Sequence, residues 1–343
     1  MDQSADKIRE KNGRFAFVFA GLIFLLVTVT LVNITLGNVE IPFDRIVSIL
    51  SGGGRESKEY TILMMIRLPR IIMAALLGGA LALSGYLLQT FFNNPIAGPF
   101  VLGISSGAKL MVALTLIISL RSFSGISSLG MVVSSFGGSL LATLFILLIS
   151  KKIRDNATLL IAGIMIGYIS SALTDFIMNF AEDSNIVNLH GWSLGSFSGT
   201  SWNDVGIAAV FTVLGFMITL MFSKPIGAFL LGENYAKSLG VNVRFFRGVI
   251  ILLSSLLSAL VTAFAGPISF VGIAVPFLTK RALNTSKTLV IIPAVFLSGA
   301  VFVSICDLIA RLAFSPTELS ISTVTGLLGA PVVIFMLIGR KRS

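Results

Sequence analysis

The chain has 343 residues, of which 55% are apolar and only 12% are charged. This composition, with a mean hydropathy of +0.97, excludes a water-soluble enzyme and predicts a chain that lies mostly in a lipid bilayer. The formal charge of +10 does not indicate nucleic-acid binding, because the basic residues stand in short groups between apolar runs. The single cysteine, Cys306, excludes an intrachain disulfide, and the single histidine, His190, leaves no Cys and His cluster for zinc.

The first apolar run, 15–36, follows a basic segment that contains Lys7, Arg9, Lys11 and Arg14. The order of charge and apolar residues resembles a signal peptide, but the run is longer than a secretory apolar region and has no clear cleavage site. About 20 apolar residues are needed to cross a bilayer core. The run is therefore predicted to be an uncleaved first span whose N-terminal side is cytoplasmic.

Nine further apolar runs predict a single polytopic all-α membrane domain, 1–343, with ten transmembrane helices. These runs are 68–88, 99–119, 128–150, 157–180, 204–222, 246–265, 268–279, 288–310 and 321–338. The run 268–279 is too short to cross ~30 Å of hydrocarbon alone, so it is predicted to borrow flanking residues or to be a broken helix. With ten spans both termini are cytoplasmic, and most of the 25 Lys and Arg residues fall on the cytoplasmic side, as the positive-inside rule requires.

A short internal similarity links the two halves of the chain. AGPFVLG at 97–103 matches AGPISFVG at 265–272, and in each copy a Gly-Pro pair opens a short apolar segment. In the ten-span topology the copies lie on opposite sides of the membrane, which predicts an inverted repeat relating spans 2–5 to spans 7–10. A chance match of this short motif is the alternative.

No phosphate-binding loop is present, because GGGRESK at 52–58 lacks the required spacing and follows no strand. The chain is therefore predicted not to be an enzyme that hydrolyses ATP.

Several long motifs in a fixed order resemble the permease subunits of ABC importers for iron-siderophores, haem and vitamin B12, the FecCD and BtuC-like family. They are RLPR at 67–70, GGALALSGYLLQTFFNNPIAGPFVLGISSGA at 78–108, WSLGSF at 192–197, LGENYAKSLGV at 231–241, GPISFVGIAVPFLTKR at 266–281 and DLIARLAFSPTELSISTVTGLLGAPVVI at 307–334. The resemblance covers nearly the whole chain. It implies ten spans, a permease dimer of identical or paralogous chains, two cytoplasmic ATPase subunits that use ATP and Mg, and an extracytoplasmic substrate-binding protein.

The resemblance also implies roles for three arginines at the outer ends of spans 2 and 9. Arg67, Arg70 and Arg311 match positions that pair with acidic residues of the binding protein, and a guanidinium can hold a carboxylate through two hydrogen bonds. Snorkelling to the membrane interface is the alternative. Asp307 stands four residues before Arg311, so on a continuous helix its carboxylate is placed to orient that arginine.

The connection between spans 6 and 7, residues 223–245, is predicted to be a cytoplasmic coupling segment. Its residues match a family pattern whose short helices insert into a cleft of the ATPase, and small residues allow such a close approach. The matching residues, with one neighbouring acid, are Gly232, Glu233, Ala236, Leu239 and Gly240. A solvated surface helix is the alternative.

Three further residues are predicted to line or narrow the transport pathway. The resemblance places Asn94 and Ile96 at its cytoplasmic end, where a simple turn is the alternative. Lys109 departs from the small or apolar residue usual at its position, and it is predicted to face the pathway and attract an anionic chelate, to snorkel, or to pair with Asp175. Phe277, Ser320 and Ser322 also depart from the family pattern.

Together these features predict a permease of the bacterial cell membrane that moves an iron-siderophore chelate, binds no cofactor or metal of its own, and contacts no nucleic acid. Haem or a corrinoid is the alternative substrate within the family. An ion-coupled secondary transporter is the alternative class, for which Asp175 and Asp307 are the candidate ion ligands.

Overall fold

The computed structural model describes residues 2–37, 39, 41–53, 55, 57–119, 128–153 and 155–340. Every regular element in these residues is a helix. In chain order the helices are α1 (Asp2–Thr35), α2 (Phe43–Leu50), α3 (Lys58–Thr61), the π-helix η1 (Ile62–Arg67), α4 (Leu68–Phe92), the 3-10 helix η2 (Pro99–Leu102), α5 (Ile104–Ser119), α6 (Ser128–Ser150), α7 (Asn156–Met178), α8 (Asp183–Leu194), α9 (Trp202–Met221), α10 (Ser223–Leu230), α11 (Glu233–Ser238), α12 (Val243–Ala265), α13 (Val271–Leu283), α14 (Thr288–Leu312) and α15 (Ile321–Arg340).

Eight helical stretches among the described residues are long and apolar enough to cross a membrane. They lie in α1, in the continuous stretch Lys58–Phe92, and in α6, α7, α9, α12, α14 and α15. The predicted class, an all-α membrane protein, is thereby confirmed. The count of eight differs from the predicted ten because α5 and α13, which stand at two predicted spans, are shorter helices.

Both short helices follow a break in the backbone. The predicted span 99–119 is divided at Gly103, whose φ of 71° ends η2 before α5 begins. The predicted span 268–279 is α13, which begins later, after Gly266 and Phe270 adopt φ values of 74° and 63°. A left-handed residue cannot continue a right-handed helix, so these positions set the helix limits. The short helices α2 and α8 were not predicted, whereas α10 lies in the segment 223–245, for which the resemblance implied short helices.

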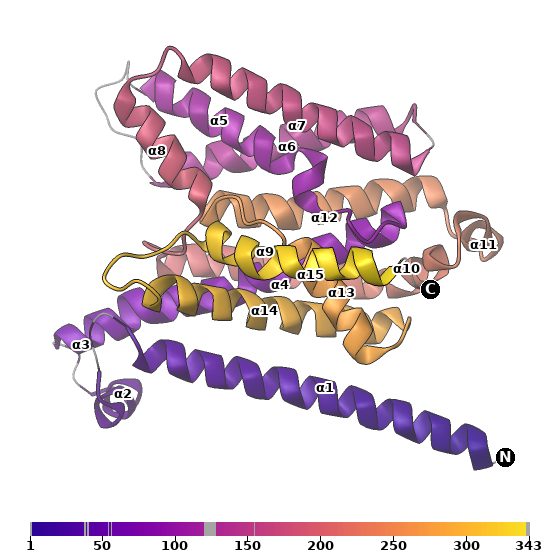
Figure 1. Ribbon diagram of the computed structural model, residues 1–343, viewed down its shortest axis with the longest axis horizontal. Helices are drawn as coiled ribbons and strands as arrows, with labels where there is room; N and C mark the ends of the chain where they lie inside the picture. Colours follow the sequence, from indigo (N-terminus) through magenta and orange to yellow (C-terminus); the bar gives the residue numbers. More distant parts are fainter. Residues whose placement is uncertain are drawn as a thin grey trace.

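Most of the long helices run roughly along the long axis of the molecule (Figure 1). α4 lies in the interior, whereas α1 lies at the outer edge and leaves most of its apolar surface exposed. α11, the start of α1 and the end of α15 lie at one end, called here the α11 end. α2 and α3 lie at the other, the α3 end. The chain therefore begins and ends on the same side of the bundle.

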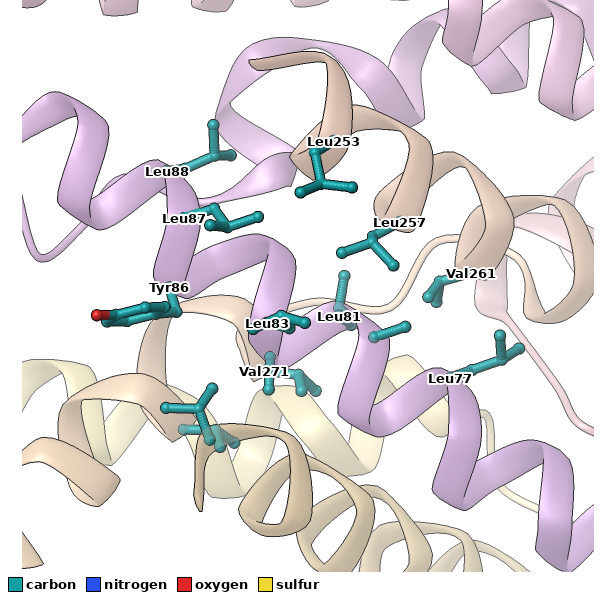
Figure 2. Close-up of a cluster of buried hydrophobic side chains, with 14 of the residues drawn as sticks. Leu77, Leu81, Leu83, Tyr86, Leu87, Leu88, Leu253, Leu257, Val261 and Val271 are labelled. Carbon is teal, nitrogen blue, oxygen red and sulfur yellow. The ribbon is translucent and has the colours of Figure 1, made fainter. Parts of the chain in front are cut away.

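The centre of the bundle is the contact between α4 and α12, with α13 packed against α4 (Figure 2). Leu253 and Leu257 of α12 lie against leucines of α4, and Val271 of α13 approaches α4 from another side. Small residues in α4 let its backbone come close to its neighbours. A Cβ atom on Gly85 would overlap the carbonyl group of Gly272 in α13.

Two serines exchange hydrogen bonds where α4 and α12 meet. Ser84 Oγ donates to the carbonyl oxygen of Ser254 at 2.7 Å, and Ser254 Oγ donates to that of Ser84 at 3.1 Å. The neighbours of the two helices also correspond: α4 packs on α13 and α14, whereas α12 packs on α5 and α6. Within each set the later helices also pack in corresponding pairs, α5 with α6 and α7, and α13 with α14 and α15.

A side chain of α4 compensates for the proline inside α13. Pro276 has no N–H to donate to the carbonyl of Gly272, four residues earlier. Gln89 Nε2 lies 3.3 Å from the Gly272 oxygen and 3.1 Å from the Ile273 oxygen. The carbonyl that Pro276 leaves without a helical donor is thus satisfied by a side chain of α4.

Candidate functional site

The arginine cluster, Arg67, Arg70 and Arg311, lies at the α3 end where α1, α4 and α14 meet. All three residues are buried, with 4%, 7% and 7% of their surface exposed. Arg70 donates from Nε and Nη2 to Asp307 Oδ1 at 3.1 and 2.9 Å, and its Nη1 lies 3.0 Å from Glu318 Oε2. The carboxylates that hold Arg70 therefore belong to this chain.

The other two arginines of the cluster form hydrogen bonds with the C-terminal end of α1. Arg67 Nη1 donates to the carbonyl oxygens of Ile34 and Thr35 at 2.6 and 3.2 Å. Carbonyls in the last turn of a helix have no partner within the helix, so a guanidinium satisfies them well. Arg311 Nη2 donates to Asn33 Oδ1, and Arg311 Nε lies 3.5 Å from Asp307 Oδ2.

These positions qualify the docking prediction. The sequence placed the three arginines at the outer ends of spans and paired Asp307 with Arg311. The structure brings the three together and gives them intramolecular partners, with Asp307 contacting Arg70 as well as Arg311. Contact with a binding protein stays a prediction, and Glu318, with 38% of its side chain exposed, is the partner nearest to solvent.

The predicted coupling segment forms α10 and α11 at the α11 end. Gly232 and Gly240 flank α11 with φ values of 114° and 82°. Glu233 at the start of α11 pairs with Lys237, Oε1 to Nζ, at 2.9 Å. The segment therefore includes a separate short helix bounded by two left-handed glycines.

Apolar side chains are exposed on and beside α11. Leu231, Tyr235 and Leu239 expose 69%, 48% and 60% of their surface. Ala236, which the sequence placed in the ATPase contact, is fully buried against this chain's own core. Leu231, Tyr235 and Leu239 are thus accessible at the surface, whereas Ala236 packs α11 against the bundle.

The turn that contains the predicted gate residues follows α4 directly. Asn93 ends α4 with a φ of 46°, and Asn94 Oδ1 accepts a hydrogen bond from the Ile96 amide at 3.1 Å. Ile96 is 40% exposed. An open cleft beside this turn is lined by Phe92, Asn93, Asn94, Asn156, Ala157, Leu160 and Ile161.

Asp155 caps α7 next to this cleft. Its Oδ2 accepts hydrogen bonds from the hydroxyl and the amide of Thr158 at 2.6 and 2.7 Å. These bonds favour the ionised carboxylate and hold the pKa of Asp155 below its usual value. The start of α7 is therefore fixed beside the turn.

Lys109 lies on α5 and is partly buried. Among the residues whose side chains the structure describes, no carboxylate lies within ion-pair distance of Lys109, and Asp175 is exposed on α7. The suggested pairing of Lys109 with Asp175 is therefore wrong. Orientation toward the pathway and snorkelling remain open.

Sequence reasoning did not single out Arg247 of α12, which lies between the coupling segment and the turn after α4. Its Nη2 lies 3.5 Å from Glu233 Oε2 and 3.5 Å from Asn156 Oδ1. A sequence signal was present, because an arginine five residues into an apolar helix needs polar partners.

The described residues contain no cluster of three His, Cys, Asp or Glu side chains able to hold a metal ion.

Comparison with known proteins shows similarity over nearly the whole chain. The model of the FecCD transport family matches residues 25–339. The uncharacterized ABC transporter permease protein YvrB of Bacillus subtilis is 32% identical over 353 residues, which cover 100% of this chain and 99% of that protein. The vitamin B12 import system permease protein BtuC of Salmonella paratyphi A is 32% identical over 277 residues, 81% of this chain and 83% of that protein.

A solved structure shares the fold. It is an inward-facing transporter assigned to the metal-chelate type of ABC transporters, with a TM-score of 0.82 and 27% identity, covering 94% of this chain and 99% of that one. The family match and the full-length relatives show that this chain, an ABC transporter permease, belongs to the FecCD transport family.

Proposed function

We propose that this chain imports an iron-siderophore chelate, with ATPase subunits bound at the α11 end and a substrate-binding protein bound at the α3 end. The observation that carries the proposal is α11 itself. It is a short helix between two left-handed glycines, with Leu231, Tyr235 and Leu239 exposed at the end of the bundle where the chain begins and ends (Figure 1). Exposed apolar groups on a separate helix suit a protein partner rather than water.

The transport pathway in this proposal lies between two permease subunits of ten spans each. In this proposal α5 and α13 are the ninth and tenth membrane spans in addition to the eight long ones, and each is a short helix that follows a break in the backbone. The mutual hydrogen bonds of Ser84 and Ser254 support an inverted repeat of α4 to α7 and α12 to α15. ATP and Mg are used by the partner subunits.

The substrate proposal rests on the solved transporter of the metal-chelate type, which matches nearly the full length of this chain. A corrinoid is the second candidate, because the relatives named for vitamin B12 import are 32% identical. Haem is the third. Membership of an ABC permease family counts against an ion-coupled secondary transporter.

Uptake by whole cells distinguishes these substrates. Cells with and without the gene are given a radioiron-labelled ferric siderophore, radioiron-labelled haem or radiocobalt-labelled cobalamin. We expect loss of the gene to abolish uptake of the ferric siderophore alone. Loss of cobalamin or haem uptake instead would assign that substrate.

Copurification tests the assignment of the α11 end. Leu239→Ser is expected to reduce the amount of ATPase that copurifies with the permease, because it removes exposed apolar contact area. Leu50→Ser is the matched control, since Leu50 on α2, at the opposite α3 end, is similarly exposed, at 56%. Equal ATPase recovery from both variants would contradict an ATPase contact at α11.

A further inference from the structure

Arg247 occupies the point where four segments meet near the α11 end. Its Nη2 contacts Glu233 Oε2 of α11 and Asn156 Oδ1 of α7, each at 3.5 Å. Its Nη1 donates to the carbonyl oxygen of Ile153, before α7, at 3.4 Å. The guanidinium carbon also lies 5.6 Å from the ring centroid of Phe91 in α4. We call these five residues the Arg247 junction.

Asn156 extends the junction to the backbone of α4. Its Nδ2 donates to the carbonyl oxygen of Phe91 at 3.0 Å. That carbonyl lacks a helical donor, because the residue four positions later is Pro95, which has no N–H. The turn that carries Asn94 and Ile96 starts two residues after Phe91. The junction therefore ends at the base of the predicted gate.

The chemistry of the junction favours an arginine. One side chain contacts a carboxylate, an amide oxygen, a carbonyl and a ring face, and a planar guanidinium with several donors can make all four contacts at once, whereas a lysine ammonium can keep only some of them. Arg247 also lies near the N-terminal ends of α12 and α7, where helix dipoles disfavour a cation. The carboxylate of Glu233 offsets this cost, so the position of Arg247 depends on the position of α11.

We propose that Arg247 is a positioning residue that transmits displacement of α11 to the 93–98 turn. The inference rests on the proposed function, in which α11 is the helix that contacts the ATPase. The two flanking glycines permit α11 to move as a unit, and Glu233 moves with it. Arg247 and Asn156 then carry the movement to the Phe91 carbonyl through continuous contacts.

Glu233 divides its two oxygens between different cations, and only one of these cations belongs to the junction. Oε1 contacts Lys237, whose side chain is 55% exposed, whereas Oε2 contacts Arg247, whose side chain is only 12% exposed. Lys58 on α3, at the opposite end of the bundle, is exposed. Lys58→Gln removes one positive charge outside both the junction and the coupling segment, so it is not expected to affect transmission and serves as the control.

The test compares two spin-label distances in the permease copurified with its ATPase subunits. Cys306 is first replaced by alanine, and Met217 on α9 serves as the exposed reference position. One label pair joins Met217→Cys to Tyr235→Cys on α11, and the other joins Met217→Cys to Ile96→Cys in the turn. Both distances are measured by electron paramagnetic resonance before and after trapping with ATP and vanadate.

In the otherwise unchanged protein we expect both distances to shift on trapping. In Arg247→Gln the Tyr235 shift is expected to persist and the Ile96 shift to be lost, whereas Arg247→Lys should restore part of it. Lys58→Gln should keep both shifts. A purely structural role for Arg247 would instead lower complex recovery and alter both shifts together.

Asn156→Asp provides a second variant if Arg247→Gln does not assemble. It keeps an oxygen for Arg247 and removes the donor to the Phe91 carbonyl, so the Ile96 shift should again be lost. A normal Ile96 shift in Arg247→Gln, or in Asn156→Asp where that variant alone assembles, would overturn the inference. Absence of a Tyr235 shift in the unsubstituted complex, with active ATPase, would instead count against the proposed function of α11.

Discussion

Asp307 of α14 holds Arg70 of α4 in a buried two-point contact at the α3 end. Nε and Nη2 of the arginine both lie within 3.1 Å of Oδ1, and the carboxylate is only 2% exposed. Arg311, one helical turn after Asp307, approaches the second oxygen at 3.5 Å. One carboxylate thus compensates two buried arginines and joins two helices that are distant in the sequence.

Replacing this carboxylate is expected to destabilise the protein strongly. Asp307→Asn leaves Arg70 and Arg311 with insufficient negative charge, and breaking a buried ion pair costs about 3–5 kcal/mol. Thermal unfolding in detergent should therefore give a clearly lowered midpoint. Asp175→Asn, which removes an exposed carboxylate, should leave the midpoint unchanged, and equal midpoints for the two variants would contradict a stabilising role for Asp307.

Glu318 is expected to compete with the binding protein for Arg70. It is the more exposed of the two acids on Arg70, and its oxygens lie 3.0 and 3.1 Å from Nη1. If Arg70 docks an acidic partner, Glu318→Gln frees that donor and should tighten binding several-fold in a titration with the purified binding protein. Glu182→Gln removes an equal charge from an exposed residue before α8 and serves as the control. Weaker or unchanged binding in Glu318→Gln would indicate that Arg70 has a structural role only.

Gly85 is expected to tolerate no side chain. A Cβ there would overlap the Gly272 carbonyl, so Gly85→Ala must push α13 away from α4 and disturb the Gln89 hydrogen bonds. Such overpacking costs about 1–3 kcal/mol or more. Gly206→Ala in α9, where a Cβ meets open space, should leave the recovery of folded protein unchanged. Recovery of folded Gly85→Ala equal to that of Gly206→Ala would contradict the close contact.

The membrane helices were predictable because a run of about 20 apolar residues fits the thickness of a bilayer core and is rare in water-soluble chains. The ends of α5 and α13 were harder to predict, since they depend on residues with a left-handed backbone conformation, such as Phe270. A phenylalanine rarely adopts this conformation, so the sequence gives no sign of it. The hydrogen bond from Gln89 to the Gly272 carbonyl, which Pro276 leaves without a helical donor, depends on two segments that meet only in the folded chain. No pattern along one helix contains that information.

The candidate site was only partly predictable, because its residues meet through contacts between segments that are distant in the sequence. The sequence singled out Arg70, Asp307 and Glu233, but it paired Asp307 with Arg311 and not with Arg70. It did not single out Arg247, the less exposed partner of Glu233. Ala236 was assigned by its small size to a partner contact, whereas small residues serve internal helix packing equally well. Burial separates the two uses, and it is a property of the folded chain.

Lys109 is expected to affect substrate choice more than folding. The structure contains no ion pair between Lys109 and any carboxylate whose side chain it describes, so Lys109→Ala strands no buried negative charge. The melting temperature should therefore be unchanged or higher, since removing an unpaired charge from a membrane helix is favourable. Asp175→Asn, alone or in combination, should add nothing, because the two groups are not coupled.

If Lys109 faces the pathway, its loss weakens attraction for an anionic chelate and leaves a neutral one unaffected. A difference of about 1.4 kcal/mol corresponds to a tenfold change. We therefore expect the half-saturating concentration for uptake of an anionic ferric siderophore to rise about tenfold in Lys109→Ala, with no change for a neutral one. Equal effects on both chelates would place Lys109 outside the pathway and leave snorkelling as its role. A lowered melting temperature rescued by Asp175→Asn would show instead that the two residues interact during folding.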